Sequence, residues 1–124
     1  MLEDKDRGVR GRAAVALAQL SESHPARLLR VSSRLREMLG DDAAYVRWHL
    51  LYALGRLMAR YPRTAATLLA DIVARLEDEN RVCRVMALRA VVPVAAQETR
   101  RIEEVYRELR KSIPPEVSRV LRKS

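Results

Sequence analysis

Residues 39–57, LGDDAAYVRWHLLYALGRL, decide the fold because the same pattern occurs twice more in the chain. A shift of 37 residues aligns this stretch with residues 2–20, LEDKDRGVRGRAAVALAQL, and with residues 76–94, LEDENRVCRVMALRAVVPV. The three copies align without a gap, and each has an aspartate followed six residues later by an arginine. An internal repeat of this length is typical of a protein built from stacked helical units.

Apolar residues recur at helical spacing inside each copy. In the middle copy, Leu50, Leu54 and Leu57 are three or four residues apart, so they share one face of a helix. The second half of the unit repeats as well, with Pro25 and Pro62 at equivalent positions. Proline is well tolerated in the first turn of a helix, where its missing N–H has no intrahelical partner to lose. A second helix is therefore expected to begin at each proline.

The sequence predicts three helical hairpins, with Thr99 taking the place of the prolines in the third. The first helices are expected at 5–22, 42–60 and 79–97, and the second helices at 25–38, 62–75 and 99–112. Pro114 and Pro115 are expected to close the last hairpin, because proline disrupts a continuing helix. Residues 115–123 can add one short basic helix.

The second helices are expected to bury one stripe per unit. The stripes are Leu28, Val31, Ser32, Leu35 and Leu39, then Ala65, Leu68, Leu69, Ile72 and Leu76, then Ile102, Val105, Tyr106, Leu109 and Ile113. The chain is expected to form one domain over residues 1–124, with repeats at 2–38, 39–75 and 76–113 and a basic tail at 114–124.

The pattern of an aspartate, then Val-Arg, then aliphatic residues at helical spacing and a second helix resembles the HEAT-repeat family. The resemblance covers nearly the whole chain and implies an all-α fold, an α-α superhelix or HEAT-like solenoid. It also implies a structural ladder that ties the start of one unit to the first helix of its neighbour. The ladder residues are Asp4, Asp41, Asp78, Arg10, Arg47 and Arg84. Pro93 lies inside the predicted helix 79–97, at a place that resembles the kink common in the first helix of such repeats.

The composition limits the classes of function. Net charge is +8 with a pI near 10.5, which favours acidic partners without selecting one. The single cysteine, Cys83, excludes an internal disulfide, and no apolar run is long enough to span a membrane. We expect a cytoplasmic protein with no membrane contact.

Catalytic chemistry has few candidate residues. His24 and His49 stand alone, Cys83 occupies a predicted core position, and no serine or cysteine has an arranged base. No metal-ligand spacing or phosphate-binding loop occurs. The sequence predicts a protein that is not an enzyme and has no cofactor and no small-molecule substrate.

A cluster of large side chains leaves two interpretations open. Tyr45, Trp48 and Tyr52 share one face of the second unit's first helix, where unit one has Gly8 and Gly11. These rings can fill the junction between units, which is the favoured interpretation, or they can form an exposed binding patch.

The predicted function is that of an interaction scaffold that binds a protein through the outer face of its second helices. The resemblance implies that this face is concave. The candidate partner-binding residues are Arg27, Arg30, Arg34, Arg101, Arg119, Arg122 and Lys123. The alternative is a nucleic-acid-binding accessory protein that uses this arginine stripe and the basic tail. A homodimer is a third interpretation, because the last hairpin carries surplus apolar residues, namely Val82, Val85, Met86 and Val92.

Overall fold

The computed structural model describes residues 1–112, and all regular structure in that range is helical. The helices are α1 (Arg7–Ser23), α2 (Pro25–Leu29), α3 (Ser32–Glu37), α4 (Ala44–Arg60), α5 (Ala65–Ala74) and α6 (Arg81–Ser112). Three short 3-10 turns join them, η1 (Met38–Gly40), η2 (Pro62–Thr64) and η3 (Arg75–Glu77). The chain divides into two compact units, unit 1 (Met1–Val94) and unit 2 (Ala95–Ser124). The all-α, solenoid-like fold class predicted from the sequence is confirmed.

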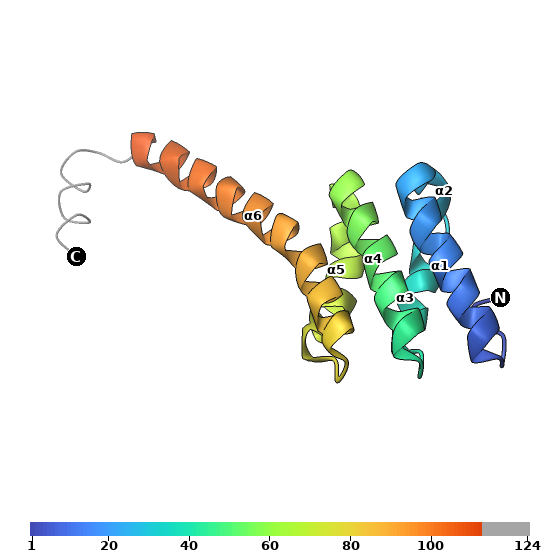
Figure 1. Ribbon diagram of the computed structural model, residues 1–124. Helices are drawn as coiled ribbons and strands as arrows, with labels where there is room; N and C mark the ends of the chain where they lie inside the picture. Colours follow the sequence, from blue (N-terminus) through green and yellow to red (C-terminus); the bar gives the residue numbers. More distant parts are fainter. Residues whose placement is uncertain (113–124) are drawn as a thin grey trace. The chain divides into compact units, whose positions relative to one another are not determined.

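Unit 1 has two layers of helices (Figure 1). The helices α1, α4 and the first half of α6 lie side by side in one layer, and α2, α3 and α5 form the other. This is the arrangement of helical hairpins stacked in sequence order. The helices α1 and α4, which are the first helices of two successive repeats, pack along each other.

Local sequence signals determine where the first helices begin and end. Asp6 caps α1 by accepting a hydrogen bond from the backbone N–H of Gly8 at 2.7 Å. Asn80 does the same for α6 with the N–H groups of Val82 and Cys83, at 2.9 and 3.1 Å. Such caps satisfy N–H groups that have no partner inside the helix. Pro25 and Pro62 directly follow His24 and Tyr61, the C-cap residues of α1 and α4.

The core lies in unit 1 and is built mainly from leucine, valine, isoleucine and alanine, together with Met58 and Cys83. Helix α4 is its centre, because Leu50, Leu51, Leu54 and Leu57 are all fully buried. The other layer contributes a ridge of aliphatic residues to the same cluster. Its buried members are Leu28, Leu35, Leu39, Leu68 and Ile72. These positions belong to the first two predicted stripes.

The second helix of the first repeat is shorter than predicted. A single helix was expected over 25–38, but α2 ends at Leu29 and α3 begins at Ser32. Val31 is 42% exposed, although it was predicted to be buried. The hydroxyl of Ser32 donates to the carbonyl of Leu29 at 3.0 Å. Serine side chains compete in this way for backbone groups, and together with a β-branched valine they weaken the helix at this point.

The prediction of a third hairpin is wrong at its turn. Two helices were expected at 79–97 and 99–112, but α6 runs without interruption from Arg81 to Ser112. The first two hairpins turn at His24-Pro25 and Tyr61-Pro62, whereas the third unit has Glu98-Thr99 and therefore keeps its N–H donors. The hydroxyl of Thr99 donates to the carbonyl of Ala95 at 3.0 Å within the helix.

The third predicted stripe is therefore not buried in unit 2. Ile102, Val105, Tyr106 and Leu109 are between 54% and 67% exposed, and every residue from 95 to 111 is exposed. Ile113, Pro114, Pro115 and the short helix expected at 115–123 lie outside the described residues. In the described range, no helix combines the length and apolar character needed to cross a lipid bilayer.

Candidate functional site

The arginines and aspartates that repeat every 37 residues meet at the junctions between successive units. Arg10 on α1 donates through Nε to Asp41 at 2.9 Å and through Nη2 to Asp42 at 2.8 Å. Its Nη1 donates to the backbone carbonyls of Asp4 and Lys5, at 2.8 and 3.0 Å. The guanidinium thus joins the start of its own repeat to the start of the next.

Arg47 on α4 repeats the arrangement one unit further along. Its Nε and Nη2 donate to the two carboxylate oxygens of Asp78, each at 3.0 Å, and its Nη1 donates to the carbonyl of Asp41 at 2.8 Å. The side chains of Arg47 and Asp78 are 6% and 1% exposed. A bidentate pair of this kind fixes orientation as well as distance.

Two opposing effects act on the pKa of Asp78. Burial alone raises the pKa, but hydrogen bonds from Arg47, from the backbone N–H of Asn80 and from Arg75 outweigh it. The pKa of Asp78 is therefore lowered, and the carboxylate is charged at neutral pH. The pKa of Arg47 is raised, chiefly by its hydrogen bond to Asp78. Both groups are held in a structural pair, which leaves neither free for acid-base chemistry.

The ladder is incomplete at Asp4 and at Arg84. Asp4 accepts the backbone N–H of Asp6 at 2.9 Å, but no arginine lies within ion-pair distance of it in the described range. The Nη1 of Arg84 donates to the carbonyls of Asp78 and Glu79, at 2.8 and 3.1 Å. Among residues 1–112, Arg84 has no carboxylate partner, and unlike Arg10 and Arg47 it is exposed.

The aromatic cluster lies at the junction between α1 and α4. A Cβ added to Gly11 would lie 3.1 Å from the ring of Tyr45, so glycine gives this ring its space. Trp48 stacks on His49 with ring centroids 3.6 Å apart, and the hydroxyl of Tyr52 donates to Glu22 on α1. Junction packing thus accounts for the cluster, although Tyr45 is still 51% exposed.

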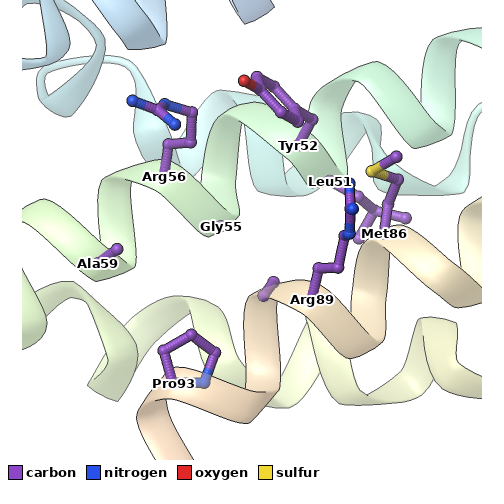
Figure 2. A pocket seen from close by; sticks show the side chains of 9 residues that line it. Leu51, Tyr52, Gly55, Arg56, Ala59, Met86, Arg89 and Pro93 are labelled. Atoms are coloured by element: carbon purple, nitrogen blue, oxygen red, sulfur yellow. The ribbon is translucent and has the colours of Figure 1, made fainter.

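A small hollow of about 160 Å³ lies between α4 and the first half of α6 (Figure 2). Its floor is the close approach of Gly55 to Ala90, where a Cβ on Gly55 would lie 2.9 Å from the Cβ of Ala90. Its rim carries Arg56 and Arg89, with the guanidinium of Arg56 5.8 Å from the centre of the Tyr52 ring. The hollow is mostly apolar and has no carboxylate or thiol lining.

The predicted arginine stripe is only partly free. Arg27 and Arg30 are exposed, and neither has an ion pair in the part of the chain described. Arg34 is also exposed, but its guanidinium pairs with Glu3. On α5 the corresponding surface includes Asp71, which pairs with Arg36 at 3.4 Å. Of the three arginines in the stripe, only Arg27 and Arg30 have no ion pair in the described range.

A second hollow adjoins this surface. It has a volume of about 500 Å³ and is lined by Leu29, Arg60, Tyr61, Pro62, Arg63, Thr64 and Thr67. The guanidinium of Arg60 lies 5.3 Å from the centre of the Tyr61 ring. Leu29 belongs to the same helix as Arg27, and Arg30 follows it directly. Together these residues form an apolar patch with a cationic rim and no acidic lining residue, which we call the α2–η2 surface.

The remaining candidate residues belong to unit 2. Arg101 is exposed on α6. Arg119, Arg122 and Lys123 lie outside the described residues. Unit 2 also carries Tyr106, with the guanidinium of Arg110 5.7 Å from its ring centre.

Sequence reasoning missed two parts of this site. Asp42 is a second acceptor for Arg10, and its place directly after a ladder aspartate is the signal that could have identified it. The α2–η2 surface depends on residues from two helices and a turn, so no spacing in the sequence predicts it. The run Arg60-Tyr61-Pro62-Arg63 does contain its aromatic and cationic components.

No group of three or more His, Cys, Asp and Glu side chains in the described range could hold a metal ion. The thiol of Cys83 is buried, and burial raises its pKa. A thiol in this state is a poor nucleophile, because the thiolate is the reactive form.

Comparison with models of known protein families identifies a family for this chain. The family of non-SMC mitotic condensation complex subunit 1, Cnd1, matches residues 1–122. No curated protein and no solved structure matches the chain. Because the family match covers nearly the whole sequence, the chain belongs to the Cnd1 family of non-SMC mitotic condensation complex subunit 1.

Proposed function

We propose that this chain is a non-catalytic scaffold that binds a protein partner within a complex through the α2–η2 surface. The family is described as a subunit of a condensation complex, and subunits of complexes bind other proteins. The HEAT-like character of the repeats fits this proposal, because stacked helical hairpins present extended surfaces for partners.

One observation carries the choice of surface. The α2–η2 surface combines an apolar centre, Leu29 and Tyr61, with the cationic groups of Arg27, Arg30 and Arg63. Interfaces typically place aromatic and arginine side chains at their energetic centre and polar groups around it. An amphipathic helix or loop with an apolar anchor and several carboxylates has the chemistry to bind here.

Nucleic acid is the alternative ligand, and the exposed Arg27 and Arg30 favour it. A phosphate backbone that continued from these arginines onto α5 would approach Asp71, whose carboxylate is 52% exposed. Binding to a phosphate backbone also requires several cations along its path and weakens steeply as salt rises. The apolar centre of the surface has no role in such binding, and we therefore favour a protein.

The test compares a double charge reversal with a matched control. Tagged wild-type chain, Arg27→Glu/Arg30→Glu and the control Arg100→Glu/Arg107→Glu are each used to recover partners from cells, with and without nuclease treatment. Quantitative mass spectrometry then compares the recovered proteins. We expect a defined set of proteins that resists nuclease, is lost with the α2–η2 variant and is retained with the control.

Two outcomes would contradict the proposal. Recovery that disappears after nuclease treatment would favour the nucleic-acid alternative, and mobility-shift assays with duplex DNA and single-stranded RNA at physiological salt would then test it directly. Recovery that is lost with the Arg100→Glu/Arg107→Glu variant alone would move the binding surface to unit 2.

A further inference from the structure

We propose that this chain associates head to tail with a second copy of itself, with Asp4 of one copy pairing with Arg84 of the next. The proposal goes beyond partner binding, because it uses different residues on different helices. Unit 1 contains two junctions between successive repeats. Each joins an arginine on a first helix to an aspartate at the start of the following unit, as Arg10–Asp41 and Arg47–Asp78.

Arg84 is the third arginine of this series and lacks the acidic partner that the other two have. Its Nη1 is held by the carbonyls of Asp78 and Glu79, as the Nη1 of Arg10 is held by those of Asp4 and Lys5. The guanidinium is therefore anchored in the orientation that the ladder uses. In Arg10 and Arg47, the Nε and Nη2 groups donate to carboxylates. The same two groups of Arg84 have no carboxylate partner in the described range.

Asp4 is the complementary group. It accepts the N–H of the residue two positions on at 2.9 Å, and Asp41 and Asp78 accept the equivalent N–H groups at 2.9 Å as well. This turn presents the carboxylates of Asp41 and Asp78 to an arginine of the preceding unit. Asp4 occupies the equivalent turn at the start of the first repeat. It is exposed and has no arginine partner in the described range.

The helix faces around these two groups are apolar and uncovered. On α6, Val85, Leu88 and Val92 are 44%, 54% and 53% exposed. The positions equivalent to Leu88 in α1 and α4 are Ala14 and Leu51, which are both fully buried. The exposed face of α6 thus resembles the surface that α1 and α4 bury in the junctions between units, but no helix of the described range covers it.

The face of unit 1 beside Asp4 is suited to receive the exposed face of α6 from a second copy. A hollow of about 450 Å³ there has a mostly apolar lining that includes Leu2, Ala16, Leu17, Leu20 and Val31. Ala16 is the counterpart of Ala90, the residue that α6 directs at Gly55 of the preceding helix. Small residues on this face leave space for Leu88 and Val92.

A second copy supplies this acid better than the same chain does. The position 37 residues after Asp78 is Pro115, which has no carboxylate, and the next residue is Glu116. Glutamate there corresponds to Asp42 and Glu79, which are the secondary acceptors for Arg10 and Arg47. Because Asp4 occupies the primary position and lies on a different face of the molecule from Arg84, the resulting contact is head to tail.

The experiment is sedimentation velocity on the full chain over a concentration series. The variants are Arg84→Asp, Asp4→Arg, an equimolar mixture of the two, and the control Arg107→Glu on α6, which matches the charge change of Arg84→Asp. Circular dichroism on each variant checks that it is folded. We expect wild type and the control to show a mass that rises with concentration, and each single variant to associate at least about tenfold more weakly.

The mixture provides the decisive comparison. It restores a native Asp4–Arg84 pair at one junction and a reversed pair at the other, so association should return to the wild-type level. Wild type that stays monomeric throughout overturns the proposal. Association that is unchanged in Arg84→Asp and Asp4→Arg also overturns it.

Discussion

The carboxylate of Asp78 is buried and has three hydrogen-bond partners. Its carboxylate accepts from Arg47, from the backbone N–H of Asn80 and from Arg75. The desolvation of such a group is balanced only while its partners remain in place. Removal of its charge therefore leaves the guanidinium of Arg47 buried without a counterion.

We expect Asp78→Asn to lower the free energy of unfolding at neutral pH by about 3 kcal/mol, the scale for removing one partner of a buried ion pair. Urea denaturation followed by circular dichroism measures the change. The control is Asp71→Asn, because the Asp71–Arg36 pair is half exposed and such pairs contribute about 1 kcal/mol or less. Equal losses in the two variants would contradict a special role for the buried pair.

The same residue predicts the pH dependence of stability. The pKa of Asp78 is lower in the folded chain than in the unfolded chain, so its contribution is fully present above the unfolded pKa of about 3.9. It is lost as the pH falls through the folded pKa. The difference in stability between wild type and Asp78→Asn should therefore shrink below about pH 4. A difference that is constant across this range would show that the charge of Asp78 does not contribute.

At the level of helices, α4 and α6 approach each other closely at Gly55 and Ala90. Gly55→Ala should lower the free energy of unfolding by about 1 kcal/mol, although alanine is the better helix former by about the same amount. The added methyl group would lie 2.9 Å from the Cβ of Ala90, and neither group can rotate away. Chemical denaturation measures the change.

Gly40→Ala is the matched control, because a Cβ at Gly40 meets no atom within 4 Å and its φ is not positive. It should be neutral or slightly stabilising. The double variant Gly55→Ala/Ala90→Gly should show a favourable coupling energy, since it moves the methyl group from one helix to the other. Additive losses would contradict a steric contact between the two positions.

The same comparison of helices shows what the sequence can and cannot predict. Pro25 and Pro62 identify two turns, because proline acts through its own backbone and needs no tertiary context. The third turn was inferred from register alone, and Glu98-Thr99 has no property that stops a helix. The pairing of Arg47 with Asp78 follows from the repeat. The hollow at Gly55 does not, because it depends on the separation of two helices.

At the level of the whole molecule, the two units should differ in local stability. The backbone N–H groups of α4 are enclosed by α1, α2, α3 and α5, whereas residues 95–111 are all exposed. We expect hydrogen exchange at residues 99–111 to be orders of magnitude faster than in α4, since an uncovered helix of this length is marginal in water. Mass spectrometry of peptides from the two regions measures this.

Protection of residues 99–111 equal to that of α4 would contradict the prediction. It would mean that the stripe of Ile102, Val105 and Tyr106 is covered in solution. A dilution series separates the two sources of such cover, because cover by another molecule is lost at low concentration and cover by the same chain is not.

The stack of Trp48 on His49 has a practical consequence. Trp48 is the single tryptophan of the sequence, and it lies at the junction of α1 and α4 with the ring of Tyr45 5.7 Å away. Its fluorescence emission therefore comes from one place, where two repeats meet. Separation of the repeats would change the emission before α4 itself loses its helical structure. The chain thus contains its own optical reporter for the opening of one junction, and no dye needs to be attached.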